Sequence, residues 1–282
     1  MDFNISEKRC FCYGVQRAYE KTINLSNEYS NIYLYGQLVH NDSVILKLKE
    51  KGIKIFEDIT SLPEDSKNSL VIIRAHGISL KEKEILIKNF EKIIDLTCPI
   101  VKKLVEFSQK KQKENFFLII FGEKNHPEVK CIKGNLEAEN LLITKDIKKI
   151  AQKNICIISQ TTCEYNEFKK FYVNFLKNNE FSDIIIKNTI CNETYLREKE
   201  AEEISKNSDL VIVIGGKNSS NTKKLYNISK NNCSNTFFIS TLFDLDNLPI
   251  NKNSKIGVLT GASTPEWQMN EILNQIKNKV LN

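Results

Sequence analysis

The chain has 282 residues and a formal net charge of +6, from 41 lysines and arginines against 35 aspartates and glutamates. Hydrophobic residues make up 41% of the chain and charged residues 27%, which is ordinary for a soluble globular protein. The longest apolar run, Phe116 to Phe121, is too short to cross a bilayer, and lysines spread over helix faces do not favour nucleic-acid binding. We therefore expect no membrane role and no nucleic-acid partner.

Eight cysteines are present, and the N-terminal residues carry no pattern typical of a targeting peptide. Without a secretion signal, a disulfide framework is not favoured, and metal binding or redox work remains for the cysteines. The sequence therefore predicts a cytoplasmic protein.

Short, continuous apolar runs recur along the chain and alternate with helical patterns. Such runs are typical of parallel strands that are buried on both faces, with helices as the crossovers between them. The expected strands are residues 32–35, 70–74, 92–95, 116–121, 155–159, 183–187, 210–214, 236–239 and 256–260. The fold class predicted from this pattern is α/β with mainly parallel sheets.

The helical segments between these runs carry recognisable signals at their ends and on their faces. Ser79 and Glu82 resemble a capping pair, and Pro99 suits the first position of a helix. The clearest helix is expected at residues 164–179, where apolar side chains recur at i, i+3, i+4, i+7 and i+8 from Phe168. Those aromatic side chains are expected in the core.

One unit is repeated three times along the chain. Cys12, Cys98 and Cys191 each stand 28 residues before a residue in a polar cluster that follows an expected strand. The clusters are Gly36–Asp42, Gly122–Glu128 and Gly215–Asn221. A further strand then ends in a third polar group, at Ala75–Gly77, Gln160–Thr162 and Ala262–Thr264.

An internal period of about 90 residues indicates three similar small modules rather than unrelated cysteines. We expect module boundaries at residues 1–97, 98–190 and 191–282, with the extreme N-terminus packing with the third module. The modules are predicted to stand in a pseudo-threefold arrangement around a central cluster and substrate cavity, because loops at the carboxyl ends of parallel strands form the site in such units.

The three repeated cysteines each precede an expected helix, where backbone N–H groups and the helix dipole favour thiolate over thiol. Three thiolates could bind zinc or an iron–sulfur cluster. Structural zinc sites use close Cys-x-x-Cys pairs, whereas Cys10 and Cys12 form the only near pair in this chain. A [4Fe-4S] cluster with three cysteine ligands leaves one iron that can act as a Lewis acid. We favour the cluster.

All three histidines of the chain, His40, His76 and His126, lie in the repeated strand-end groups. Imidazoles, hydroxyls and helix N-termini together make a set of donors that suits a phosphate or diphosphate. The other members of this set are Thr161, Ser219, Ser220, Asn221 and Ser263. Glu128 is the one carboxylate among them and would be a proton donor if burial raises its pKa.

These residues together resemble the family of 4-hydroxy-3-methylbut-2-enyl diphosphate reductases from end to end. The N-terminal half of the resemblance rests on Phe11-Cys12-x-Gly14-Val15-x-x-Ala18, His40-Asn41, Ala75-His76-Gly77 and Thr97-Cys98-Pro99-x-Val101. The C-terminal half rests on His126-Pro127-Glu128-Val129, Gln160-Thr161-Thr162, Thr189-Ile190-Cys191, Lys217–Thr222 and Gly261–Pro265. The ordered set of motifs is specific, although no single motif decides it.

The resemblance implies a site and a reaction. Cys12, Cys98 and Cys191 would hold a [4Fe-4S] cluster with one iron unligated by protein, and Glu128, Thr161 and His126 would act in catalysis. The diphosphate would be bound by His40, His76, His126, Thr161, Ser219, Ser220, Asn221 and Ser263. Two electrons from a ferredoxin or flavodoxin would convert the allylic diphosphate to isopentenyl and dimethylallyl diphosphate, in the last step of the non-mevalonate isoprenoid pathway.

The chain departs from the family pattern near the first and third cysteines, where Cys10, Asn192, Glu193 and Glu198 replace glycine, alanine or glutamine. Added charge near a cluster shifts its reduction potential. Two other functions remain open from the residues alone: a non-redox sensor that binds a phosphorylated metabolite, and a cluster-dependent dehydratase that consumes no electrons. Glu128 argues against a sensor, which would not need a proton donor.

Overall fold

The computed structural model describes residues 2–246, 248–250 and 252–281. Within them lie three four-stranded sheets in which every pair of neighbouring strands is parallel. The predicted α/β class with parallel sheets is confirmed. Residue 1, the start of the first predicted module, and residue 282, the end of the third, lie outside the described residues.

The chain divides into two compact units. Unit 1 comprises Met1–Arg17, Val39–Glu50 and Asn192–Asn282, and unit 2 comprises Ala18–Leu38 and Lys51–Cys191. Unit 2 contains two of the sheets and unit 1 contains the third. The module boundaries expected from the repeat stay a prediction.

The first sheet of unit 2 has the strand order β3-β2-β4-β5. Its strands are β2 (Ile32–Tyr35), β3 (Lys54–Phe56), β4 (Leu70–Ile73) and β5 (Lys92–Asp95). The helical segments that precede, link or follow these strands along the chain are α1 (Tyr13–Glu28), α2 (Asp42–Glu50), which belongs to unit 1, the 3-10 turn η1 (Ser66–Asn68) and α3 (Leu80–Asn89). α3 begins with the expected capping box, in which the Ser79 hydroxyl and the Glu82 carboxylate each accept from the other residue's backbone N–H.

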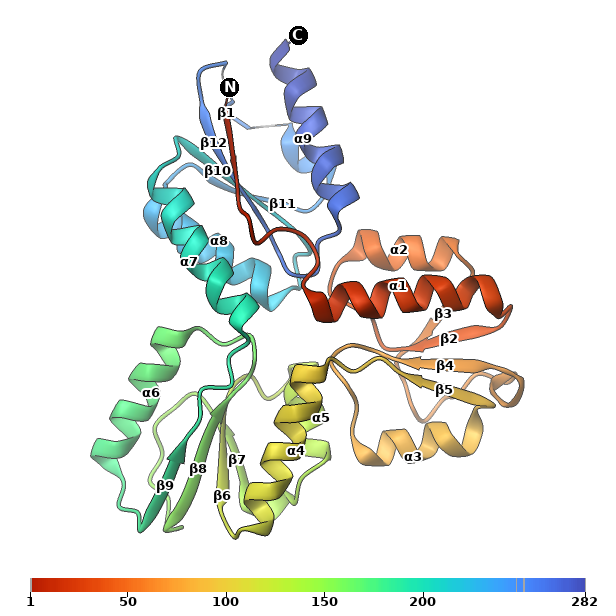
Figure 1. Cartoon of the computed structure of the whole chain (residues 1–282), viewed down its shortest axis with the longest axis vertical. Helices are drawn as coiled ribbons and strands as arrows, with labels where there is room; N and C mark the ends of the chain where they lie inside the picture. The colour runs from red at the N-terminus through yellow and green to blue at the C-terminus, as the bar shows by residue number, and fades with distance from the viewer. Residues whose placement is uncertain (1, 247, 251, 282) are drawn as a thin grey trace. The chain divides into compact units, whose positions relative to one another are not determined.

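The second sheet of unit 2 has the order β7-β6-β8-β9 and lies between helices on both faces (Figure 1). Its strands are β6 (Phe117–Phe121), β7 (Leu141–Thr144), β8 (Asn154–Ser159) and β9 (Asp183–Ile186). Its helical segments are α4 (Pro99–Lys113), α5 (Pro127–Gly134), η2 (Ala138–Asn140) and α6 (Tyr165–Asn178). Alternate residues of β6 pack on α4 and α5 or on α6, whose Phe168, Phe171 and Phe175 are buried as expected.

The sheet of unit 1 has the order β1-β12-β10-β11, with α7 and α8 on one face and α9 on the other (Figure 1). Its strands are β1 (Asp2–Ile5), β10 (Leu210–Ile214), β11 (Thr236–Ile239) and β12 (Lys255–Thr260). Its helical segments are α7 (Asn192–Lys206), α8 (Ser220–Asn232), η3 (Leu242–Leu245) and α9 (Glu266–Leu281). The N-terminal strand β1 thus completes a sheet made otherwise from the C-terminal part of the chain.

The three sheets have the same strand order if β1, at the start of the chain, is counted as the last strand of the third sheet. β3, β7 and β11 occupy one edge, whereas β5, β9 and β1 occupy the other edge. Cys98 follows β5 and Cys191 follows β9, and Cys12 likewise follows β1. The repeat seen in the sequence is therefore a repeat of strand position.

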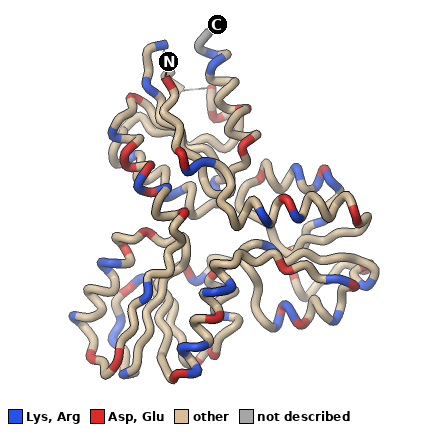
Figure 2. The backbone as a smooth tube through the Cα atoms, in the orientation of Figure 1, with Lys and Arg blue, Asp and Glu red and all other residues tan. Residues whose placement is uncertain are grey.

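Charged residues occur along most helices of the chain, with lysine and arginine positions interspersed among acidic ones (Figure 2). Several of them form exposed pairs, such as Lys206 with Glu202 and Lys153 with Glu180. Pairs of this kind contribute little to stability. Among the described residues no helix is both long enough and apolar enough to cross a membrane.

Candidate active site

Each repeated cysteine is anchored in the same way to a neighbouring strand end. The backbone N–H of Cys12 donates to the Ala262 carbonyl at 3.1 Å, that of Cys98 to the Ala75 carbonyl at 2.9 Å, and that of Cys191 to the Thr161 carbonyl at 2.8 Å. All three acceptors belong to the third polar group of the repeat. Each cysteine therefore lies between the end of a parallel strand and the start of a helix.

Four of the remaining cysteines differ from these three in burial. Cys131, Cys156, Cys163 and Cys233 are buried, whereas Cys12, Cys98 and Cys191 are half-buried, as is Cys10. Burial raises the pKa of Cys131 and Cys156 to about 12, which keeps both as thiols. Cys156 lies in the core of the second sheet, as its apolar strand predicts.

The donor chemistry of Cys12, Cys98 and Cys191 fits a cluster held by three thiolates. Cys12 belongs to unit 1, and Cys98 and Cys191 belong to unit 2. No group of three or more His, Cys, Asp or Glu side chains that could hold a metal ion occurs among the residues that the structure describes. The fit therefore rests on the partial exposure of these three cysteines and on their common position before helices.

Glu128 is the buried acid of unit 2, with an exposed fraction of 2%. Its Oε1 accepts from the backbone N–H of Thr161 at 2.8 Å, and its Oε2 accepts from the Thr161 hydroxyl at 2.5 Å. Burial raises the pKa of Glu128 above its ordinary value, and the hydrogen bonds from Thr161 oppose that rise only in part. This environment favours a protonated carboxyl, as a proton donor requires.

The sheet register brings Glu128 and Thr161 together. β6 and β8 are neighbours with Phe121 opposite Ser159, so the loops that follow both strands leave the same edge of the sheet. Gly122 allows these loops to approach closely, because a Cβ there would lie 3.0 Å from the side chain of Gln160 and 3.2 Å from Val129. The first turn of α5 therefore presents its carboxylate to the end of β8.

His126 caps the same helix in unit 2. Its Nδ1 accepts from the backbone N–H of Glu128 at 3.2 Å, which leaves Nε2 as the protonated nitrogen of the neutral ring. The rings of His76 and His126 meet edge to face, with centroids 5.6 Å apart. Two of the three predicted imidazole donors therefore lie side by side, and one of them, His126, is two residues from the buried acid and bonded to its N–H.

In unit 1 the predicted donors gather at the start of α8. Ser219 is the N-cap, and its hydroxyl accepts from the Thr222 N–H at 3.3 Å. Asn221 Oδ1 accepts from the Ala262 N–H at 2.9 Å, which fixes the orientation of the amide. A Cβ on Gly216 would lie 2.0 Å from the carbonyl oxygen of His40, so this glycine lets the His40 backbone pass close to the β10–α8 loop.

Two of these donors are buried without an acceptor. The Asn221 Nδ2 and Ser263 Oγ atoms find no hydrogen-bond partner among the residues that the structure describes. Burying a donor unsatisfied costs about 1–3 kcal/mol. A bound anion would satisfy both groups, which is the role that the sequence predicts for them.

Asn41 is a buried polar residue, adjacent to His40 in sequence, that the predicted site residues leave out. Its Nδ2 donates to the Ser263 carbonyl at 3.0 Å and to Gln268 Oε1 at 2.9 Å, while its Oδ1 accepts from the Ser43 N–H. It therefore fixes the backbone of Ser263 and the start of α2, next to His40. Its place directly after a histidine in a strand-end cluster was the available signal.

The predicted residues are divided evenly between the units. Unit 1 contains Cys12, His40, Ser219, Ser220, Asn221 and Ser263. Unit 2 contains His76, Cys98, His126, Glu128, Thr161 and Cys191. Unit 1 thus holds mainly anion donors, and unit 2 holds the acid and two of the thiols.

Residues 4–277 match the model of the LytB protein family. The chain belongs to the LytB family. The family resemblance that the motifs predict is thereby confirmed, and the match extends over parts of both compact units.

LytB relatives of this chain carry one activity in their names. A 4-hydroxy-3-methylbut-2-enyl diphosphate reductase from Petrotoga mobilis is 44% identical over 99% of this chain and 98% of its own length. One of the same name from Pseudothermotoga lettingae is 40% identical over 97% of this chain and 96% of its own length.

Solved LytB structures have the same fold. The E-1-hydroxy-2-methyl-but-2-enyl-4-diphosphate reductase from Plasmodium falciparum superposes with a TM-score of 0.86 at 30% identity, over 98% of this chain and 88% of the other. A second reductase, described as the terminal enzyme of the non-mevalonate pathway, gives a TM-score of 0.70 at 33% identity, over 98% of this chain and 99% of the other.

Proposed function

We propose that this LytB protein is a 4-hydroxy-3-methylbut-2-enyl diphosphate reductase. The reaction breaks the allylic C–O bond and consumes two electrons and two protons. One proton leaves with the hydroxide as water, and the other forms a new C–H bond in isopentenyl or dimethylallyl diphosphate. The observation that carries the proposal is the buried Glu128, which is hydrogen-bonded to Thr161. Glu128 stands two residues after His126, whose ring accepts from its backbone N–H.

Cys12, Cys98 and Cys191 would hold a [4Fe-4S] cluster, each through one thiolate at the start of a helix. When bound, the cluster supplies electrons one at a time and a Lewis-acidic iron that has no protein ligand. The protein's share of the chemistry is to bind the diphosphate, orient the allylic alcohol and deliver protons.

The predicted diphosphate donors of unit 1 have the chemistry that a phosphate group requires. Asn221 Nδ2 and Ser263 Oγ are two buried donors that find no partner among the described residues, and Ser219 and Ser220 lie at the N-terminus of α8. His40, His76, His126 and Thr161 complete the predicted set. Helix N-termini favour anions through their exposed N–H groups and their dipole, so the start of α8 adds to the binding of the phosphate oxygens.

Glu128 and Thr161 deliver the proton that makes hydroxide a good leaving group. Burial raises the pKa of the Glu128 carboxyl, which favours its protonated form, and the Thr161 hydroxyl in contact with it can relay that proton to the departing oxygen. The Thr161 N–H holds the other carboxylate oxygen, so the acid has a fixed orientation.

A ferredoxin or flavodoxin would supply the electrons, and the reaction would take place in the cytoplasm. Both proteins are small and acidic, which suits a partner with a net charge of +6.

The proposal is tested by anaerobic assay of the purified protein with reduced methyl viologen and the allylic diphosphate. We expect two viologens to be oxidised for each molecule of product, with isopentenyl and dimethylallyl diphosphate both formed. Loss of water without viologen oxidation would identify a dehydratase instead. Tight binding without any product would identify a sensor.

Glu128→Gln sharpens this test. The amide can still accept from the Thr161 N–H and can donate a hydrogen bond to the Thr161 hydroxyl, so the fold and the cluster should persist. The amide has no acidic proton, however, and cannot transfer one to the leaving hydroxide. We expect turnover to fall by about 10²–10⁴-fold with substrate binding retained. Turnover at the wild-type rate would move proton delivery to another group.

A further inference from the structure

A buried arginine lies beneath the segment that carries Cys12. Arg197 of α7 has an exposed fraction of 2% and is among the largest fully buried side chains of the chain. It stands six residues after Cys191, and the residues six after Cys12 and Cys98 are the buried apolar Ala18 and Leu104. An arginine is rarely buried unless its charge and donors are used.

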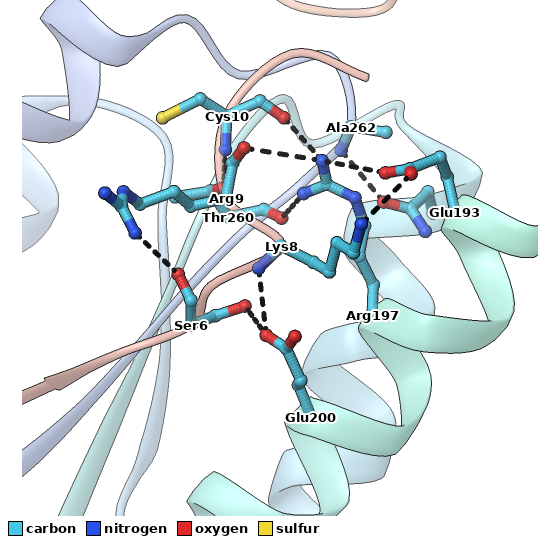
Figure 3. A network of polar contacts seen from close by, with 10 residues as sticks. Ser6, Lys8, Arg9, Cys10, Glu193, Arg197, Glu200, Thr260 and Ala262 are labelled. Carbon is cyan, nitrogen blue, oxygen red and sulfur yellow. Dashed lines mark hydrogen bonds and ion pairs between the residues drawn. The ribbon is translucent and has the colours of Figure 1, made fainter. Parts of the chain in front are cut away.

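The guanidinium of Arg197 holds three backbone carbonyls within unit 1 (Figure 3). Its Nη1 donates to the carbonyl of Thr260, at the end of β12, at 3.0 Å. Its Nη2 donates to the carbonyl of Cys10 at 2.8 Å and, at 3.5 Å, to that of Arg9. Arg197 therefore ties the segment before Cys12 to the end of the neighbouring strand.

The same helix holds the earlier part of this segment through two acidic residues (Figure 3). Glu200 accepts from the backbone N–H of Lys8 at 3.0 Å and from the Ser6 hydroxyl. Glu193 lies 3.9 Å from Nη2 of Arg197 and 3.5 Å from the ammonium of Lys8. Residues 6–10 thus depend on α7 for most of their side-chain anchoring.

The other two cysteine segments each contain a turn that is closed within the segment. Their longer-range contacts lie within their own sheets: the Thr189 hydroxyl, two residues before Cys191, donates to the Ser159 carbonyl and accepts from the Ser159 N–H at 2.8 Å. Three residues before Cys98, Asp95 Oδ1 accepts from the Thr97 N–H at 3.0 Å. Three residues before Cys191, Asn188 Oδ1 accepts from the Ile190 N–H at 3.1 Å. The equivalent residue before Cys12 is Arg9, whose side chain has no oxygen to accept such a bond.

The charge of Arg197 is only partly compensated. Its Nε is buried without an acceptor among the residues that the structure describes. Burial lowers the pKa of Arg197 from its ordinary value, and the thiolate of Cys12 is the charge that raises it most, ahead of Glu193. A fixed cation beside a thiolate acts strongly where the surroundings exclude water.

We propose that Arg197 is a positioning residue that anchors the Cys12 segment and places a fixed positive charge beside the cluster that Cys12 would hold. The inference rests on the proposed role of Cys12 as a ligand. The anchoring keeps the thiolate in place and slows cluster loss. The positive charge favours the reduced cluster, which carries one more negative charge, and so raises the reduction potential.

Two substitutions separate these effects. Arg197→Lys keeps the charge but replaces the planar fork with a single ammonium, and Arg197→Gln removes the charge. For anaerobically purified proteins of both kinds, we would measure the half-life of the cluster absorbance in the presence of a chelator. The midpoint potential would be obtained by redox titration with mediators, followed by electron paramagnetic resonance.

Both variants should lose the cluster faster than the wild-type protein, by about tenfold. Arg197→Gln should also shift the ratio of reduced to oxidised cluster by about tenfold at a fixed potential, which is about 59 mV for a one-electron couple, towards a lower potential. Arg197→Lys should restore the potential but not the half-life. A purely structural role would not give this split.

Arg9→Gln is the matched control, because Arg9 is an exposed arginine of the same segment whose Nη1 donates to the Ser6 carbonyl. Solvent screens its charge, so its removal should leave the potential and the half-life near the wild-type values.

The inference is overturned if Arg197→Gln retains both the wild-type potential and the wild-type half-life, or if Arg9→Gln has the same effects. If Arg197→Gln does not fold, as judged by circular dichroism, Arg197→Lys decides, and an unchanged half-life in that variant overturns the anchoring role. A wild-type protein without any cluster would overturn the proposed function as well. A normal wild-type cluster that is indifferent to residue 197 overturns this inference alone.

Discussion

The Cys12 segment and the Cys98 and Cys191 segments occupy equivalent places in the fold, yet they are held by different means. Before Cys98 and Cys191, a carboxylate or amide oxygen accepts from the backbone N–H two residues later. Before Cys12, the carbonyls of residues 9 and 10 accept from Arg197, which is 187 or more residues away in the chain. The backbone N–H of each cysteine is nevertheless anchored in the same way.

The difference follows from how the sheets are assembled. β5 and β9 lead directly from their own sheets into the cysteine segments, where a turn closed within the segment is joined by contacts to the neighbouring strand of the same sheet, as between Thr189 and Ser159. β1 joins a sheet whose other strands come from the C-terminal part of the chain. Its register with β12, and the course of the segment after it, are fixed by contacts with α7 and β12 over long sequence distances. Equivalent geometry therefore does not require equivalent local sequence.

The largest expected effect is loss of the cluster, and it should be the same whichever of the three repeated cysteines is replaced. Cys12→Ser, Cys98→Ser and Cys191→Ser should each lose most of the iron and sulfide of anaerobically purified protein, because each removes one of three thiolate ligands. Cys131→Ser, Cys156→Ser and Cys233→Ser are the controls and should keep the metal if they fold. Measurement of iron and acid-labile sulfide per chain checks this. An intact cluster in Cys98→Ser would break the equivalence.

Asp95 supports its segment by charge as well as by the turn. Burial raises the pKa of Asp95, but hydrogen bonds from Thr97 and the ammonium groups of Lys83 and Lys102 outweigh it and lower the pKa to about 2. Asp95→Asn keeps the oxygen that closes the turn and loses the charge, so we expect it to cost about 1–2 kcal/mol at pH 7.

The pH dependence of the Asp95 effect has a definite sign. Because the folded pKa lies below the unfolded value of 3.8, the stabilisation is present above about pH 4 and is lost as the pH falls towards 2. Urea unfolding midpoints of the wild-type and Asp95→Asn proteins should therefore converge on acidification. A difference that grows at acid pH would contradict this assignment.

Asn188 supports its segment by the turn alone. Asn188→Ala removes the acceptor for the Ile190 N–H, an exposed bond, and should cost about 0.5–1 kcal/mol without pH dependence. Asn188→Asp is the control that retains an acceptor oxygen and should unfold near the wild-type midpoint. If both variants were equally destabilised, the turn would not be the cause.

Cys10 gives the smallest effect. It has a φ of 60°, a conformation that glycine adopts without strain, and its Sγ lies 3.8 Å from the sulfur of Met269. Cys10→Gly relieves backbone strain but loses this packing and makes the unfolded chain more flexible, so we expect a change of less than about 1 kcal/mol. Burial raises the pKa of Cys10 to about 11, and cluster content should not change. Loss of iron in Cys10→Gly would make Cys10 part of the site.

The nine strands that were expected from continuous apolar runs are all present in the structure. The sequence does not predict β1, β3 or β7, which lie at or next to sheet edges, are three or four residues long and are partly exposed. β1 and β3 lack the continuous run that identifies a buried strand, whereas β7 contains the apolar residues Leu141, Leu142 and Ile143 and was missed. The expected helix at residues 164–179 is confirmed as α6, two residues shorter.

The candidate site was predictable wherever the repeat placed a reactive side chain at a strand end. Glu128 is buried as its proposed role requires, and Asn221 and Ser263 present buried donors. The hydrogen bonds that Arg197 and Asn41 donate to distant backbone carbonyls could not be predicted, because those carbonyls lie more than 60 residues away in the chain. Periodicity and spacing report which face a side chain occupies, but not which distant carbonyl it meets.

The central claim is that three thiolates of this chain hold a four-iron cluster and leave one iron free for substrate. The Mössbauer spectrum of anaerobically purified protein labelled with ⁵⁷Fe tests it most directly. The account predicts three similar irons and one distinct iron per cluster, with only the distinct signal changing when the allylic diphosphate is added. Four equivalent irons that ignore the diphosphate, or stoichiometric zinc in place of iron, would contradict it.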